Sequence, residues 1–476
     1  MIFTSLKFLV FAALTLAGYF ILPKKLRWAW ITALSVYFYL CAGLKYGVFL
    51  LISTLTVWLC GLFLKKGRWV LILTLTVNLG LLAVLKYAAF AVTNLNLLPF
   101  VSLPVPAFAA PLGVSFYTFL SVSYVTDVYR EVAQPQRNPF KLLLWLSFFP
   151  HVTQGPIDRW GALAPQLFEG HSFDYDRCAS GLRRALWGFF EKLVIADRLG
   201  MLVDPIFAAP NSYGGGKVAL AIVAYAIQIY ADFAGYMDIA CGLCEVMGIR
   251  LGENFDAPYF SASVPEFWRR WHMTLGSFFR DYLFYPVLRS GWMRRLKKRV
   301  SKRKNRKKAD KLATVIALAL VWTATGVWHG SAWHYIAWGM YYGVLIIASE
   351  LIHFKRSLPR PLQVLRTFLL VLFGYVLFRA DNLARAWEIL ARLPQLGFGG
   401  EPLGLDKKDL LVAAAGTAVL LLHDVLRVRG RRPGELVSNL PLPLRWVLVY
   451  ACVLSVVIFG VYGPDYNAAS FLYFAF

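Results

Sequence analysis

The sequence predicts an all-α, polytopic membrane protein with about eleven transmembrane helices and additional re-entrant and amphipathic helices. Three observations lead to this prediction. Hydrophobic residues make up 58% of the 476 residues, charged residues make up only 16%, and long apolar runs recur along most of the chain. Such a composition is typical of a membrane protein rather than of a large soluble core.

Each candidate span is an apolar stretch close to the roughly 20 residues that cross a bilayer as a helix. The candidates lie near residues 2 to 22, 28 to 43, 46 to 64, 69 to 93, 111 to 130, 216 to 240, 312 to 328, 332 to 352, 363 to 379, 409 to 425 and 444 to 462. Some of them are short or rich in hydroxyl groups. We therefore expect part of this set to be re-entrant.

The chain carries 50 Lys and Arg against 26 Asp and Glu, a net charge of +24. On a soluble protein this excess would suggest nucleic acid binding, but here the charge lies between apolar stretches, so membrane topology explains it and we expect no nucleic acid partner. The run from Arg289 to Lys311 holds thirteen basic residues and one acid. It is expected to be a cytosolic loop near anionic lipid, or a docking site for an acidic partner or an anionic acyl carrier.

The N-terminal apolar stretch is too long for a signal peptide, and its basic cluster at 24 to 27 follows it. We expect an uncleaved anchor. The positive-inside rule places this cluster and the one at 65 to 68 in the cytosol, hence the N-terminus outside. The nearly uncharged segment 94 to 110 then also falls outside.

The middle third, from about 131 to 311, alternates apolar with amphipathic segments. Segments 178 to 199 and 264 to 283 suit helices that lie at an interface instead of spanning. The whole chain, 1–476, is expected to be a single membrane domain. Its parts are N-terminal helices at 1–110, a core with the catalytic layer at 111–381, and C-terminal helices at 382–476.

The most informative stretch runs from Thr325 to Ser331, where His329 ends an apolar span. An ionisable group at membrane depth is costly and indicates function. Imidazole has the pKa needed to take a proton from a hydroxyl that attacks a thioester; the alternative is a satisfied structural histidine. Gly326 and Gly330 are expected to leave room for a substrate chain.

The other histidines are weaker candidates. His272 belongs to the amphipathic segment 264 to 283, where it is either catalytic or a polar residue at the interface. His334 is five residues from His329, so the two cannot share one helical face. The remaining histidines lack a supporting constellation; they are His151, His171, His353 and His423.

Asp232 and Asp238 lie in an otherwise apolar helix. They either orient a histidine or pair with Arg269 or Arg280, and we expect a buried ionic network under the site because unpaired buried charges are costly.

Residues 147 to 160 mix helix breakers with an Asp and an Arg, as in a re-entrant turn. No Walker loop, metalloprotease motif or metal-spaced His and Cys cluster occurs. The six cysteines form no disulfide framework, and Cys241 and Cys244 are expected to serve packing. The sequence therefore predicts no metal site and no permanently bound cofactor.

Seven ordered motifs resemble those of the membrane-bound O-acyltransferase family, in particular its bacterial alginate O-acetylating and teichoic-acid D-alanylating proteins. The resemblance extends over most of the chain, from about 86 to 381. The motifs are Pro111 to Phe119 with Asp127 to Arg130, Gln154 to Arg159, Asp232 to Tyr236, Glu253 to Tyr259, Glu266 to Leu275 with Arg280 to Tyr282, Trp328 to Gly330, and Phe378 to Ala380.

The resemblance implies a ring of helices around a thinned centre, with a tunnel joining the two faces of a bacterial inner membrane. It implies that His329 is the catalytic histidine and His272 the second recurrent one. From the motifs and from the apolar helix that carries the two aspartates, further residues are candidates for substrate binding or structural support. These are Asp158, Arg159, Asp232, Asp238, Arg269, Arg280 and Trp328.

Within the family, Gln154 to Arg159 resembles the D-alanylation branch, whereas 163 to 167 and 187 to 193 resemble the polysaccharide O-acetylating branch. The Gly-Gly-Asn-Arg of alginate-type members is replaced here by Val287 to Ser290. We expect acyl transfer, acetyl by preference, from a cytosolic thioester, acetyl-CoA or an acyl carrier protein, to a hydroxyl of an exported glycan or a relay partner. The alternatives are D-alanyl transfer toward teichoic acid and, in another class, a transporter or flippase or a scaffold.

Overall fold

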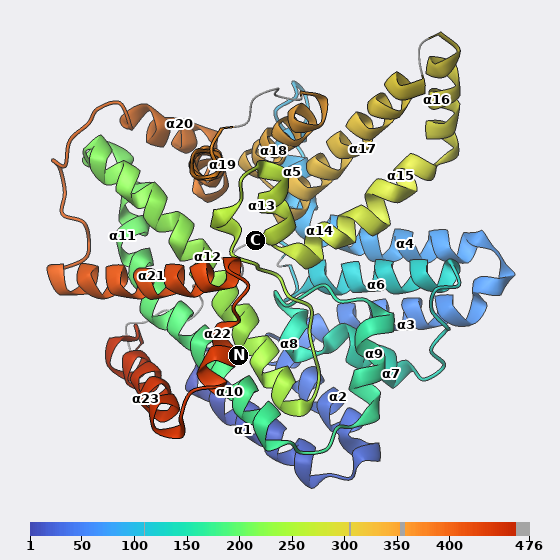
Figure 1. Cartoon of the computed structure of the whole chain (residues 1–476). Coiled ribbons are helices and arrows are strands. Elements are labelled where there is room, and N and C mark those ends of the chain that lie inside the picture. Colours follow the sequence, from blue (N-terminus) through green and yellow to red (C-terminus); the bar gives the residue numbers. More distant parts are fainter. Residues whose placement is uncertain (109, 304–305, 353–357, 463–476) are drawn as a thin grey trace.

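The computed structural model (Figure 1) describes residues 1–108, 110–303, 306–352 and 358–462. Within these ranges the chain folds into helices, and β pairing is confined to two isolated bridges. The predicted all-α class is therefore confirmed.

The helices of the first half are α1 (Leu6–Ile21), α2 (Lys24–Leu40), α3 (Gly47–Phe63), α4 (Arg68–Leu82), α5 (Ala88–Leu95), α6 (Val114–Tyr129), α7 (Pro139–Ser147), α8 (Phe149–Val152), α9 (Trp160–Glu169), α10 (Tyr175–Phe189), α11 (Asp197–Ala208) and α12 (Gly215–Met247). Those of the second half are α13 (Val264–Arg270), α14 (Met273–Phe279), α15 (Tyr285–Arg289), α16 (Gly291–Arg303), α17 (Arg306–His329), α18 (Trp333–Leu351), α19 (Arg360–Arg379), α20 (Leu383–Arg392), α21 (Lys407–Val428), α22 (Pro433–Ser438) and α23 (Leu442–Phe459). Short 3-10 turns are η1 (Leu44–Tyr46), η2 (Leu64–Lys66), η5 (Pro210–Ser212) and η6 (Pro258–Phe260), and π-helical segments are η3 (Ala83–Tyr87), η4 (Phe190–Ala196) and η7 (Arg280–Phe284).

The described part of the chain contains seven helical stretches that are long and apolar enough to cross a membrane. They are Leu44–Lys66, Arg68–Leu95, Gly215–Met247, Arg306–His329, Arg360–Arg379, Lys407–Val428 and Leu442–Phe459. The other four predicted spans are also helices, namely α1, α2, α6 and α18, but each is shorter or more polar. The chain is a multi-pass membrane protein. The number of eleven spans and the tunnel stay predictions.

Helix α12 forms the centre of the fold. It is 33 residues long, and 83% of its most apolar 18-residue stretch is buried. It contacts α10, α11 and α19. Glycines allow the approach of α10: a Cβ on Gly188 would lie 2.5 Å from the carbonyl oxygen of Gly235. Small residues at such contacts let membrane helices pack with their backbones close together.

The predicted interfacial helix 264 to 283 is wrong as a continuous element, because it breaks at Trp271 and His272. Trp271 pairs with Phe255 in an isolated bridge. His272 adopts the left-handed conformation, with φ 47° and ψ 52°. The break separates α13 from α14 and turns His272 inward, where 2% of it is exposed, instead of leaving it on an outer polar face.

Segment 178 to 199 is also more buried than an interfacial helix would be. It continues from α10 through η4 into α11, and the π-helical turn of η4 carries Glu191 and Lys192 into the interior.

Candidate active site

His329 is the last residue of α17 and lies among aromatic rings. Its ring centre is 4.8 Å from those of Trp328 and Trp338 and 5.2 Å from that of Phe378. Only 2% of the residue is exposed. His329 therefore lies in the interior of the protein.

The expectation that Gly326 leaves room for a substrate is wrong. A Cβ at this position would lie 2.6 Å from the carbonyl oxygen of Tyr335, so the missing side chain allows α18 to pack on α17. Gly330 also faces Tyr335, and a Cβ there would lie 2.2 Å from the tyrosine ring. Of the two glycines, Gly330 lines a cavity.

This cavity has a volume of about 520 Å³ and begins where α17 ends. Gly330 to Ala332 line one side, and the start of α6 at Gly113 to Phe116 lines another. Lys86, Thr153 and Tyr335 add polar groups to the wall, which is about equally polar and apolar. The volume fits a site for a small molecule or for one residue of a polymer.

Lys86 holds the end of α17 that carries the histidine. Its Nζ donates hydrogen bonds to the carbonyl oxygens of Trp328 at 2.6 Å and His329 at 3.4 Å. A cation at this position stabilises the negative end of the α17 dipole. Lys86 therefore fixes the last turn of the helix at the edge of the cavity.

His272 lies on the other side of Trp328. The ring centres of His272 and Trp328 are 6.3 Å apart, and those of Trp328 and His329 are 4.8 Å apart. Burial lowers the pKa of His272 to about 3, so this imidazole is neutral at physiological pH. The structure thus brings together the two histidines and the tryptophan that the sequence analysis selects.

The predicted partners of the two aspartates are wrong, although both carboxylates are paired. Asp232 accepts a hydrogen bond from Lys192 Nζ at 2.6 Å, because η4 packs along α12 and places Lys192 there. Asp238 pairs with Arg184 at 2.7 Å, across the close contact of α10 with α12. Arg269 and Arg280 are exposed and do not reach either aspartate.

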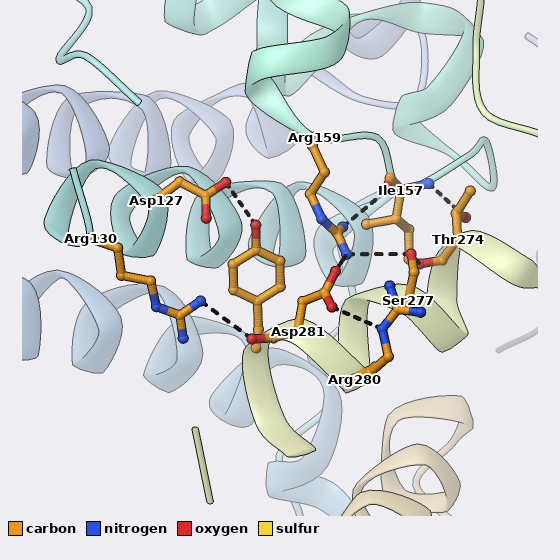
Figure 2. A network of polar contacts seen from close by, with 9 residues as sticks. Asp127, Arg130, Ile157, Arg159, Thr274, Ser277, Arg280 and Asp281 are labelled. Carbon is orange, nitrogen blue, oxygen red and sulfur yellow. Dashed lines mark hydrogen bonds and ion pairs between the residues drawn. The ribbon is translucent and has the colours of Figure 1, made fainter. Parts of the chain in front are cut away.

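Arg159 and Arg280 meet at Asp281 in a second polar network, shown in Figure 2. Arg159 Nη2 lies 3.1 Å and Arg280 Nε 3.0 Å from the Asp281 carboxylate. Burial alone would raise the pKa of Asp281, but the hydrogen bonds from Arg280 and Arg159 hold this pKa below its usual value. Arg159 and Arg280 therefore support the fold beside α14.

Asp158 lies on the same loop as Arg159. Its Oδ1 accepts a hydrogen bond from the Gly252 backbone N–H at 3.0 Å. Burial raises the pKa of Asp158 to about 7, although that hydrogen bond and the charge of Arg159 oppose the rise.

The other histidines lie apart from this centre. His151 bonds the Trp145 carbonyl oxygen, His171 bonds that of Gln166, His334 stacks edge-on against Tyr335, and His423 stacks on Trp187. His353 falls outside the described residues. Cys241 and Cys244 are buried in α12 as free thiols, and the described residues contain no group of His, Cys, Asp or Glu arranged to hold a metal ion.

Two residues that contact the histidines, Lys86 and Asn254, were not predicted from the sequence. Lys86 carried a usable signal, a lone cation within the apolar stretch 69 to 93. For Asn254 the sequence shows no such signal beyond its place in a motif, because only the fold brings its side chain to His272.

No family model matches the chain. Among curated proteins, the chain is 33% identical over 403 residues to a probable alginate O-acetylase of Pseudomonas putida, covering 81% of this chain and 78% of the relative. It is 34% identical over 343 residues to the corresponding protein of Azotobacter vinelandii, covering 72% of this chain but only 64% of that relative's length. It is 30% identical over 300 residues to the teichoic acid D-alanyltransferase of Bacillus subtilis, covering 60% and 73% of the two chains.

Proposed function

Because the chain belongs to the membrane-bound O-acyltransferase family, we propose that it transfers an acyl group, acetyl by preference, from a thioester to a hydroxyl of an extracytoplasmic polymer or of a relay protein. The observation that carries this proposal is the placement of His329. It is a buried imidazole at the end of a membrane-spanning helix, and the cavity opens at the residue that follows it.

His329 acts as the general base of the transfer. It removes the proton from the acceptor hydroxyl while the hydroxyl oxygen forms a bond to the acyl carbon. The carbon–sulfur bond then breaks, and His329 returns the proton to the leaving thiolate sulfur. The products are an O-ester and a free thiol, so no proton is gained or lost overall.

We infer a bacterial cytoplasmic membrane and a topology in which the basic ends of α3, α4, α16 and α17 face the cytosol, with the N-terminus outside. Lys86 and Gly330 then lie near the opposite ends of their helices, toward the outer face. The cavity beside them is on the side from which an exported glycan or a relay partner would approach.

Acetyl-CoA is the proposed donor. The run from Arg289 to Lys311 supplies positive charge that attracts the phosphates of CoA. Its large apolar residues are few, and one of them, Met293, is buried. The run therefore offers little apolar docking surface for a carrier protein. Free CoA would bind through its charged phosphates and would not need an apolar docking surface.

Purified full-length protein in liposomes tests the donor. We expect it to release CoA thiol from acetyl-CoA, and to label alginate oligosaccharide or a relay protein with radioactive acetyl, without any carrier. Strict dependence on an acetylated carrier protein would overturn acetyl-CoA as donor. Activity restricted to a D-alanylated carrier would favour the alternative that the similarity to the Bacillus subtilis D-alanyltransferase supports.

A further inference from the structure

Asn254 joins three segments of the chain around His272. Its Oδ1 accepts hydrogen bonds from the Thr274 backbone N–H at 3.1 Å, from Thr274 Oγ1 at 2.7 Å and from His272 Nδ1 at 3.3 Å. Thr274 Oγ1 in turn accepts a hydrogen bond from the Ile157 N–H at 2.9 Å, a contact seen in Figure 2. Asn254 is 1% exposed, so these contacts are shielded from water.

The orientation of the Asn254 amide follows from these partners. A backbone N–H can only donate, so the atom that faces the Thr274 N–H must be the amide oxygen. The amide nitrogen then faces the Met237 sulfur at 3.0 Å, a weak acceptor. The hydrogen-bond partners therefore distinguish the amide oxygen of Asn254 from its amide nitrogen.

The orientation of the Asn254 amide determines the tautomer of His272. An amide oxygen only accepts, so the hydrogen bond requires a proton on Nδ1, and in a neutral imidazole the lone pair then resides on Nε2. We propose that Asn254 is a positioning residue that fixes His272 in this tautomer and in its left-handed backbone conformation. The inference rests on the proposed function, in which His272 belongs to the reaction centre.

The fixed tautomer limits what His272 can do in the transfer. A neutral imidazole with its lone pair on Nε2 accepts a hydrogen bond or a proton at that atom but donates none from it. His272 is therefore an acceptor, and the proton that reaches the thiolate comes from His329.

The surroundings keep His272 neutral. The facing groups are the ionisable His329 of α17 and the rings of Phe233 and Trp328. Lys86 of η3 adds a positive charge near His329. Left-handed backbone is strained in a residue other than glycine. The hydrogen bonds between Asn254 and Thr274, and from the Met273 N–H to the Asn254 carbonyl oxygen, help to hold it.

The test is the pH dependence of kcat/KM for acetyl-CoA with full-length protein in liposomes. Asn254→Asp keeps the accepting oxygen but places a negative charge beside Nδ1, which raises an imidazole pKa by about one to three units. The acid limb of the profile should move up by at least one pH unit, and activity should recover at higher pH. Asn254→Leu should lower kcat by about 10²-fold at every pH.

Thr274→Val is the control, because it removes a hydrogen bond to the same oxygen without changing the contact to Nδ1. It should lower thermal stability and leave the acid limb in place. An Asn254→Asp profile that superimposes on that of the wild type would overturn the proposal, and so would a folded Asn254→Leu protein with kcat within twofold of the wild type. If Asn254→Leu does not fold, the comparison of Asn254→Asp with Thr274→Val decides.

A second readout is independent of turnover. In ¹⁵N-histidine-labelled protein, the His272 signal, assigned by its loss in His272→Gln, should show a protonated Nδ1 and an unprotonated Nε2. The opposite tautomer would overturn the role of Asn254. Failure of the wild type with every thioester donor, combined with the expected tautomer, would instead remove the proposed function.

Discussion

Lys192 Nζ lies 2.6 Å from Asp232 Oδ1, with 0% and 2% of the two side chains exposed. The same nitrogen lies 2.7 Å from Asp197 Oδ1. One cation thus compensates two carboxylates in the interior of the protein, directly beside the centre of α12.

Replacing Lys192 with Met should therefore destabilise the protein strongly. Removal of one partner from a buried ion pair costs about 3–5 kcal/mol, because the remaining charges stay buried without compensation. The measurement is thermal unfolding of purified protein in detergent. Lys297→Met is the matched control, since it removes a solvent-exposed pair with Asp310 and should leave the melting temperature almost unchanged. Equal effects of both variants would contradict this assignment.

Lys86→Met should reduce activity more than stability. The variant loses the hydrogen bonds that hold the last turn of α17, at a cost of about 1–3 kcal/mol. Small displacements of a catalytic group can lower rates by about 10²-fold. We expect a fall in kcat for acetyl transfer with little change in the KM for the donor. A changed KM with unchanged kcat would show that Lys86 binds the donor instead.

Gly188→Ala should weaken the contact between α10 and α12. The new Cβ would lie 2.5 Å from the Gly235 carbonyl oxygen, and overpacking of this kind costs about 1–3 kcal/mol. Gly161→Ala in α9 is the control, because its Cβ would meet nothing within 4 Å and Ala has a higher helix propensity than Gly. We expect a lower melting temperature for the first variant and an unchanged or higher one for the second.

Asp158 should make the stability depend on pH. Its pKa is about 7 in the folded protein and about 3.9 in an unfolded chain, so the folded state binds the extra proton between these values. The contribution to stability is complete below about pH 4, declines as the pH rises toward about 7, and is level above that. The melting temperature of the wild type should fall relative to that of Asp158→Asn over this window. Parallel curves would contradict the assignment.

The sequence was sufficient for features that one helix determines by itself. Apolar length predicted where most helices lie, and an ionisable residue at the end of an apolar span pointed to His329. It was insufficient where two distant segments meet. The partner of Asp232 depends on a π-helical turn that carries Lys192 inward, and the inward position of His272 depends on pairing between Phe255 and Trp271. Such contacts have no periodicity that a sequence pattern could reveal.

The role of His329 as general base is tested most directly by acetyl transfer with purified wild-type and His329→Ala protein in liposomes. Acetyl-CoA is the donor, and alginate oligosaccharide or a relay protein is the acceptor. His334→Ala serves as the control, because His334 is also buried and lies five residues further on. We predict that His329→Ala keeps the wild-type melting profile and loses transfer, whereas His334→Ala retains it. Transfer at the wild-type rate by a well-folded His329→Ala protein would show that His329 is not the general base.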